Sequence, residues 1–207
     1  MQSKIATELS KLINQINQMG WSVATGTNYS YRINDGTNNY WISKSGIDKS
    51  LFKPTDFLEV DSLGNPKIEN NNFKPSAENL LHALIYQKSD AMVVLHTHSQ
   101  YATVLSQFQV DRKINSLTIS GYEVQKALVN CNTHEQSINV PIFQNSQDMS
   151  YLSKEIASRW DECEMTKSFL LGNHGFYCWG NSIPEVKKYL EAYEFLFECI
   201  YKQMILK

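Results

Sequence analysis

AMVVLHTHS, residues 91–99, is an apolar run that passes directly into a pair of histidines. A run of this length predicts a buried strand, and His96 and His98 fall where that strand ends. Residues two apart in an extended chain project to the same face, so both imidazoles can reach one point in space. This geometry suits a metal ion, because histidine is a common zinc ligand.

A catalytic zinc usually has three protein ligands and one open position, so a third donor is needed. The best candidate is His174, which follows the apolar residues 169–171 and lies close to two glycines that let a ligand approach. Three imidazoles also suit iron, cobalt or manganese, so the residues alone leave the metal open. His82 and His134 are more simply interpreted as hydrogen-bonded core or surface residues.

The composition predicts a single domain over residues 1–207, since a chain that is 42% hydrophobic can bury one sizeable core. The formal net charge of -2 gives no basic field, so nucleic acid is not an expected partner. No apolar run is long enough for a bilayer and none resembles a signal peptide, so no membrane contact is expected. The four cysteines form no Cys-x-x-Cys pair, and the expected compartment is the cytoplasm.

Three polar segments offer hydrogen-bond donors for an anion. The first surrounds Asn28, the second contains Ser45 and Gly46, and the third is Ser76, ahead of an expected helix. Hydroxyls, backbone N–H groups and helix N-termini all bind anions. An ordinary turn explains the first segment equally well, and a helix N-cap explains Ser76.

Two carboxylates stand out as candidates for chemistry. Glu78 falls in the first turn of the helix expected to open at Ser76, where a negative charge favours the helix dipole in any case. Glu123 falls near the start of a helix expected after Gly121, and taken alone it is most simply a solvated helix residue.

The remaining pattern predicts packing elements. An amphipathic helix is expected over residues 5–19, a hairpin with strands at 57–60 and 67–68, a strand or edge segment at 140–143, and a helix over 146–160. A capping box at residues 182–185 opens a long final helix. That helix carries more aromatic residues than a monomer surface would comfortably expose, which predicts a subunit contact.

Together, the polar motifs occur in an order that resembles the class II aldolase/adducin family, and the resemblance spans nearly the whole chain. The motifs are Asn28-x-Ser30, Ser45-Gly46, Pro75-Ser76-x-Glu78, His96-x-His98 and Gly172-x-His174-Gly175. Within the family, residues 43–49, 56–61 and 174–180 are most similar to the dehydratases of a methylthio-ketose phosphate in methionine salvage. The resemblance implies an α/β fold with a central, mostly antiparallel sheet sandwiched by helices. It also implies a homotetramer with active sites near subunit interfaces.

The resemblance also implies roles for individual residues. His96, His98 and His174 match the family's Zn2+ ligands, and Glu123 matches the acid/base glutamate of the dehydratases. The residues implied around the phosphate of a ketose substrate are Asn28, Ser45, Gly46 and Ser76. Glu78, which is also expected at the substrate site, matches a carboxylate that aldolases use, and its role in a dehydratase is left open. Ala77 stands where sugar-phosphate aldolases have a second serine, so one phosphate donor is either missing or supplied by Lys44 or Lys49.

The function that the resemblance implies is zinc-dependent dehydration of 5-methylthioribulose 1-phosphate to 2,3-diketo-5-methylthiopentyl 1-phosphate. The first alternative is a class II aldolase or epimerase acting on fuculose, rhamnulose or ribulose phosphate, because the metal and the phosphate loops serve both reactions. The second alternative is a non-enzymatic, adducin-like binding module. The three-histidine set argues against that module, since a scaffold has no need of an open metal site.

Overall fold

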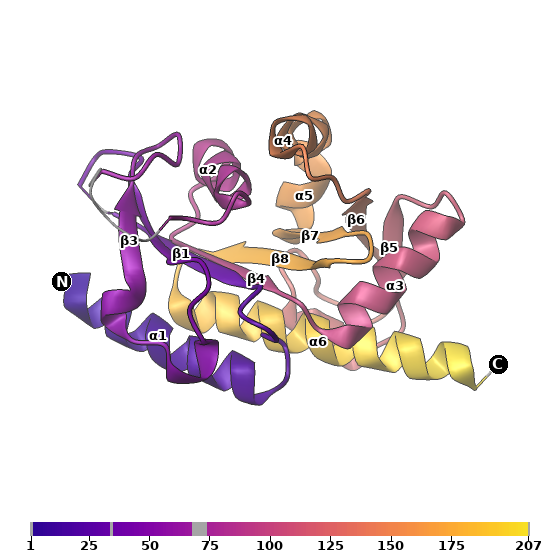
Figure 1. Cartoon of the computed structure of the whole chain (residues 1–207). Coiled ribbons are helices and arrows are strands. Elements are labelled where there is room, and N and C mark those ends of the chain that lie inside the picture. Colours follow the sequence, from indigo (N-terminus) through magenta and orange to yellow (C-terminus); the bar gives the residue numbers. More distant parts are fainter. Residues whose placement is uncertain (1, 34, 68–73, 207) are drawn as a thin grey trace.

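Eight strands form one sheet in the computed structural model, which describes residues 2–33, 35–67 and 74–206 (Figure 1). Their order across the sheet is β3-β2-β1-β4-β8-β7-β6-β5. Neighbouring strands are antiparallel except for β6 and β7, which are parallel. The strands are β1 (Asn28–Arg32), β2 (Tyr40–Ser43), β3 (Phe57–Val60), β4 (Val93–Thr97), β5 (Ser116–Ile119), β6 (Ile138–Phe143), β7 (Ser168–Leu171) and β8 (Gly175–Gly180).

Helices cover both faces of this sheet (Figure 1). The helices are α1 (Gln2–Gln18), α2 (Asn79–Lys88), α3 (Gln100–Asp111), α4 (Met149–Ser158), α5 (Trp160–Thr166) and α6 (Ile183–Ile205), with 3-10 turns η1 (Lys49–Leu51), η2 (Pro54–Asp56) and η3 (Glu123–Ala127). Apolar residues of α1, α3 and α6 form one core, and those of α2, α4 and α5 form a second core across the sheet. The expected sheet between helix layers is therefore confirmed. Among the described residues, none of the helices has the length and apolar character needed to cross a bilayer.

The strand β4 lies inside the sheet, between β1 and β8. All five of its residues are buried, because helices cover both faces of the sheet. A strand covered on both faces typically has a continuous apolar sequence, as residues 91–95 have. In the register of the three strands, His96 is opposite Asn28 on β1 and Tyr177 on β8. The end of β4 and the starts of β1 and β8 therefore meet at one end of the sheet.

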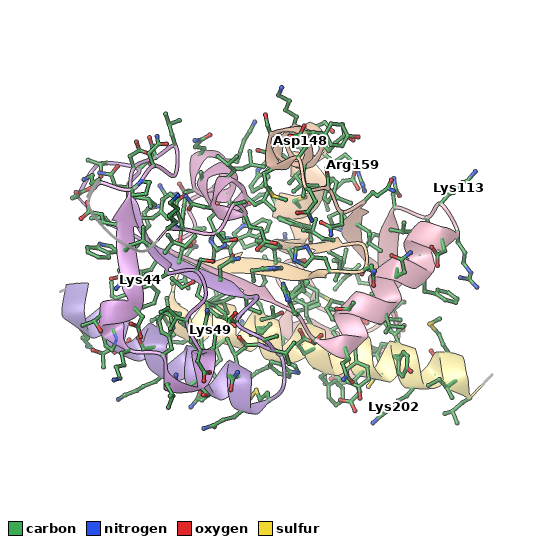
Figure 2. The ribbon with its side chains drawn as sticks, viewed as in Figure 1. Lys44, Lys49, Lys113, Asp148, Arg159 and Lys202 are labelled. Atoms are coloured by element: carbon green, nitrogen blue, oxygen red, sulfur yellow. The ribbon has the colours of Figure 1, made fainter. Side chains whose placement is uncertain are left out.

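Two helix boundaries differ from the expectation. The helix expected at Ser76 begins at Asn79, because Ser76 closes a turn in which its side-chain oxygen accepts from the Glu78 N–H and its carbonyl accepts from the Asn79 N–H. The helix expected over 146–160 is α4, which ends at Ser158, and a second helix, α5, begins at Trp160 after Arg159, which is labelled in Figure 2. The Arg159 guanidinium donates to the carbonyls of Asn115 and Ile142 beside the sheet.

Four further expectations need correction or qualification. Residues 140–143 belong to β6, which is an interior strand and not an edge. The second strand of the expected hairpin at 57–60 is reduced to one bridge between Val60 and Pro66, and Ile68 lies outside the described residues. The helix expected after Gly121 is the short turn η3.

Most aromatic residues of α6 are buried within this chain, so they give no evidence of a subunit contact.

Candidate active site and metal centre

Four side chains converge at the edge where β4 ends. Glu78, His96, His98 and His174 each offer one ligand atom, and these atoms all lie within 4.8 Å of one another. The Nε2 atoms of His96 and His98 are 2.8 Å apart, and the His174 Nε2 is 2.9 Å from Glu78 Oε1. The predicted gathering of the three histidines is therefore present, and a carboxylate joins them.

The orientation of His96 fits a metal ligand. Its Nδ1 lies 3.2 Å from the carbonyl oxygen of Phe176, so the Nδ1–H donates there and the lone pair of Nε2 faces the cluster. Such a partner on the second ring nitrogen is typical of metal-bound histidine. The Tyr177 ring stacks on the His96 ring with centroids 4.0 Å apart, which fixes the plane of the imidazole. Three imidazoles and one carboxylate suit a divalent metal such as zinc, so the residues present fit this group.

The electrostatics favour the ligand forms of these groups. Burial lowers the pKa of His98 to about 4 and the pKa of His96 well below its usual value, so both rings are neutral near pH 7. Burial alone would raise the pKa of Glu78, but its histidine neighbours and the hydrogen bond from Asn28 outweigh burial and hold it far below its usual range. Neutral imidazole and ionised carboxylate are the forms that bind a metal.

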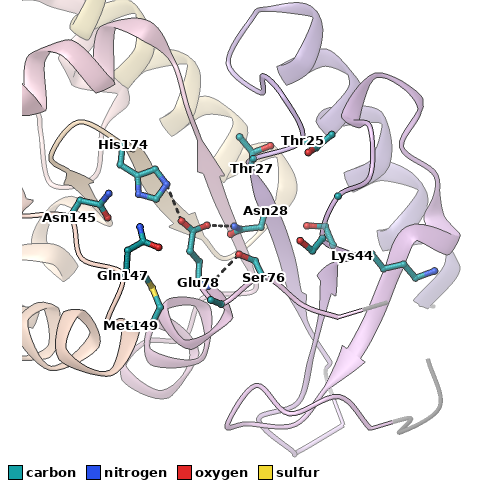
Figure 3. Close-up of a pocket in the computed structure, with 15 residues that line it drawn as sticks. Thr25, Thr27, Asn28, Lys44, Ser76, Glu78, Asn145, Gln147, Met149 and His174 are labelled. Atoms are coloured by element: carbon teal, nitrogen blue, oxygen red, sulfur yellow. Dashed lines mark hydrogen bonds and ion pairs between the residues drawn. The ribbon is translucent and has the colours of Figure 1, made fainter. Parts of the chain in front are cut away.

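A pocket of about 340 Å³ opens over Glu78 and His174 (Figure 3). One wall is made of three polar loops, and the facing wall comes from the segment that leads into α4 and from the turn between β7 and β8. The lining residues are Thr25, Gly26, Thr27, Asn28, Ser43, Lys44, Ser45, Gly46, Ser76, Ala77 and Glu78 on the first side and Asn145, Gln147, Met149 and His174 on the second. No sequence motif pointed to Asn145, Gln147 or Met149. The loops of the first wall offer hydroxyl and backbone N–H groups, which suit an anion.

The two lysines considered as replacement donors are placed differently. Lys44 lines the pocket, and its Nζ donates to the Thr55 carbonyl at 2.7 Å. Lys49 is buried away from the lining residues, and its Nζ donates to the Ile47 carbonyl at 2.9 Å. Burial lowers the pKa of Lys49 to about 8. Of the two, only Lys44 adjoins the space where an anion would lie.

Asn28 and Gly26 contact the cluster directly. The Asn28 side-chain nitrogen donates to Glu78 Oε2 at 2.5 Å, and its side-chain oxygen is hydrogen-bonded to His82 Nε2, so both ends of the amide have partners inside the protein. A Cβ on Gly26 would lie 3.0 Å from two atoms of the His98 ring, so the loop before β1 packs tightly on that ligand. His82 is buried and hydrogen-bonded, as expected.

Glu123 lies apart from these residues in the described chain. Its side chain is 70% exposed and pairs with Lys126 and with His134, whose Nδ1 is 3.6 Å from Glu123 Oε2. It neither lines the pocket nor belongs to the cluster of possible metal ligands. The acid/base role of Glu123 therefore stays a prediction, and one chain alone does not assemble it with the histidines.

Comparisons with known proteins identify relatives of this chain. The family model described as class II aldolase and adducin N-terminal domain matches residues 7–201. The methylthioribulose-1-phosphate dehydratase of Picosynechococcus sp. is 42% identical over 197 residues, which cover 95% of this chain and 91% of the relative. The protein of the same name from Enterobacter sp. is 42% identical over 194 residues, or 93% of this chain and 92% of the relative.

Solved structures agree at the level of the fold. The L-fuculose-1-phosphate aldolase from Thermus thermophilus has a TM-score of 0.77 at 20% identity, covering 100% of this chain and 98% of that structure. A sugar-phosphate aldolase from Thermotoga maritima has a TM-score of 0.72 at 16% identity, covering 98% of this chain and 96% of that structure. From the matched residues, the metal-ligand cluster and the shared fold, we conclude that this chain belongs to the class II aldolase/adducin family.

Proposed function

We propose that this chain dehydrates 5-methylthioribulose 1-phosphate to 2,3-diketo-5-methylthiopentyl 1-phosphate, a step of methionine salvage. The observation that carries the choice of reaction is the 42% identity, over 95% of the chain, to a relative named methylthioribulose-1-phosphate dehydratase. The aldolase structures are about half as similar in sequence, at 20% identity or less for the two described above, and support the fold alone.

The metal in this proposal is zinc, bound by His96, His98 and His174. Three imidazoles with one open position form the usual ligand set of a catalytic zinc. A bound divalent cation supplies Lewis-acid chemistry, which makes a carbon-bound proton beside a carbonyl more acidic. Glu78 holds its carboxylate 2.9 Å from His174 and therefore adds negative charge to the same centre.

The substrate phosphate in this proposal lies against the first wall of the pocket. Ser45, Gly46 and Ser76 present hydroxyl and backbone groups there, and Lys44 borders the same wall with its ammonium turned away to the Thr55 carbonyl (Figure 3). The Asn28 side chain is committed to Glu78 and His82, so its share in binding the phosphate falls to its backbone. With the phosphate there, the ketose carbons extend toward the cluster.

The proton transfer in this proposal belongs to Glu123. Dehydration removes a proton from C3 and the hydroxyl group from C4. The hydroxyl leaves as water after it has received a proton. The resulting enol then tautomerises to the diketone. A carboxylate that accepts the first proton can return one to the leaving hydroxyl. Because Glu123 lies outside the pocket of its own chain, we propose that it serves the pocket of a neighbouring subunit.

Retro-aldol cleavage is the second candidate, and one observation favours it. Glu78, the carboxylate expected of an aldolase, is inside the cluster, whereas Glu123 is not. The two reactions differ in their products, because an aldolase splits the carbon skeleton and releases dihydroxyacetone phosphate. A dehydratase keeps the skeleton and releases water.

The test is turnover of methylthioribulose 1-phosphate by zinc-loaded protein, with diketone formation followed by absorbance and any dihydroxyacetone phosphate followed by a coupled assay. We expect diketone that disappears with a chelator and returns with zinc. Glu123→Gln should reduce turnover by about a hundredfold or more, because a positioned acid/base is lost. Glu135→Gln, at an exposed glutamate near η3, is the matched control. Cleavage of fuculose or rhamnulose 1-phosphate without diketone would instead establish an aldolase.

A further inference from the structure

A chain of buried hydrogen bonds runs inward from Glu78 between α2 and β1. Glu78, His82 and Tyr86 are four residues apart, so they share one face of the turn and helix that carry them. Asn28 and Ser30 are two residues apart and share one face of β1. The two rows interleave, and the order of contacts is Glu78, Asn28, His82, Ser30 and Tyr86.

All four contacts in this row are short. Asn28 Nδ2 is 2.5 Å from Glu78 Oε2, and Asn28 Oδ1 is 2.5 Å from His82 Nε2. Ser30 Oγ is 2.6 Å from His82 Nδ1 and 2.7 Å from the Tyr86 hydroxyl. His82 and Ser30 are fully buried, so no solvent competes for these hydrogen bonds.

The negative charge of Glu78 sets the direction of every bond in the row. A carboxylate only accepts, so the Asn28 amide nitrogen faces Glu78 and the amide oxygen faces His82. That oxygen also only accepts, so His82 carries its proton on Nε2. A neutral ring then accepts at Nδ1 from the Ser30 hydroxyl, whose oxygen accepts from Tyr86. Burial, which lowers the pKa of His82 to about 3, keeps the ring neutral.

We propose that His82 is a positioning residue of this site: its Nε2–H holds the Asn28 amide in the one orientation that donates to Glu78. Without that donor, the amide can turn and present its oxygen to the Glu78 carboxylate, which repels it. Glu78 would then lose a fixed partner beside His96 and His174. This inference rests on the proposed metal site, but not on the identity of the substrate.

The spectroscopic test needs no variant. Nitrogen chemical shifts of His82 in the intact protein, recorded from pH 5.5 to pH 8 with and without zinc, report which ring nitrogen carries the proton. We expect a neutral ring with its proton on Nε2 throughout this range. A proton on Nδ1, or a ring that becomes charged within the range, would overturn the proposal even if the protein proved inactive toward methylthioribulose 1-phosphate.

The variants separate positioning from a packing role. His82→Leu removes both hydrogen bonds, whereas His82→Gln keeps a donor for Asn28 and an acceptor for Ser30. Thr166→Val, which removes a buried hydroxyl at the end of α5, is the control for a loss of stability alone. The measurements are zinc affinity by competition with a chromophoric chelator, kcat and KM, and the midpoint of thermal unfolding.

We expect His82→Leu to weaken zinc affinity or lower kcat by about ten- to hundredfold, the usual effect of removing a partner one step behind a metal site. His82→Gln should recover most of that loss, and Thr166→Val should lower only the unfolding midpoint. Equal losses in His82→Gln and His82→Leu, or unchanged zinc affinity and kcat in folded His82→Leu, would show that His82 only fills space. If His82→Leu does not fold, the ring proton still decides the question.

Discussion

Glu194 is a carboxyl group buried beneath the strand that carries the histidines. It lies on α6 with 1% of its surface exposed, and its Oε1 accepts from the Thr97 hydroxyl at 3.3 Å. Burial raises its pKa to about 7, although hydrogen bonds from Ser99 and Thr97 partly oppose the rise. The buried group is therefore about half protonated at neutral pH, which makes the stability of the fold depend on pH.

The sign of this dependence follows from the two pKa values. The folded value of about 7 lies above the unfolded value of about 4.3, so the unfolded chain releases its proton first as the pH rises. Stability is full below about pH 4.3 and falls as the pH rises through about 7, by about 4 kcal/mol in total. Glu194→Gln should remove this fall and be more stable than the natural chain at pH 8. Urea unfolding with chelator present, from pH 5 to pH 8.5, measures the difference.

The control for this measurement is Glu191→Gln, at a half-exposed position on the same helix. Its stability curve should run parallel to that of the natural chain. Parallel curves for Glu194→Gln as well would mean that Glu194 ionises in the folded protein as it does in water. The chelator matters, because metal binding by the nearby histidines has a pH dependence of its own.

At the level of elements, the start of β8 determines how closely the strands can approach. A Cβ on Gly175 would collide with the Thr97 carbonyl oxygen and would lie 2.9 Å from the His98 ring and 3.1 Å from the His96 ring. The sequence suggested that this glycine gives room to a ligand. The structure adds that it gives room to β4 and to the two imidazoles, because β8 and β4 are paired there.

Gly175→Ala should therefore disturb both the fold and the metal site. The backbone oxygen of Thr97 cannot turn away, so β8 must shift, at a cost of about 1–3 kcal/mol in the free energy of unfolding. Zinc affinity should fall as well, since both rings must move. In the matched variant Gly172→Ala, the new Cβ would meet the side chain of Val110, which can move, so zinc affinity should change little. Equal zinc affinity in both variants would contradict this account.

The sequence predicted the parts of the site that depend on local pattern. His96 and His98 follow from an apolar run and the two-residue period of a strand, and these rules need no knowledge of the rest of the fold. The contacts of Asn28 with Glu78 and His82 join segments 50 and 54 residues apart. They depend on the register of β1 against β4 and on the turn at Ser76 that moves the start of α2 to Asn79. The local sequence pattern predicts neither feature. The fold class came from the family resemblance.

For the whole molecule, the aromatic residues of α6 do not decide whether the chain forms a subunit contact, because the same helix pattern is expected of a core and of an interface. Tyr189, Tyr193 and Phe197 pack against the sheet of their own chain. Phe195, which is 50% exposed, faces away from that core. Evidence for an assembly must therefore come from chemistry that a single chain leaves incomplete, and Glu123 is such a group in the proposed function.

Mixing two inactive variants tests whether Glu123 serves a neighbouring subunit. Glu123→Gln keeps its histidines, and His96→Ala keeps Glu123, so co-assembled chains should form some complete sites. With equal, random mixing, about one site in four has both an intact histidine set and an intact Glu123 from its neighbour. Turnover should recover to about a quarter of the natural level.

Mixing His96→Ala with His98→Ala is the control, because every chain then has a defective set of histidines and no site can be complete. Activity that stays at the level of the separate variants, although light scattering shows that the two kinds of chain have assembled together, would mean that each chain completes its own site. The proton transfer would then be assigned to Glu78, because its carboxylate lies beside the histidines of the same chain.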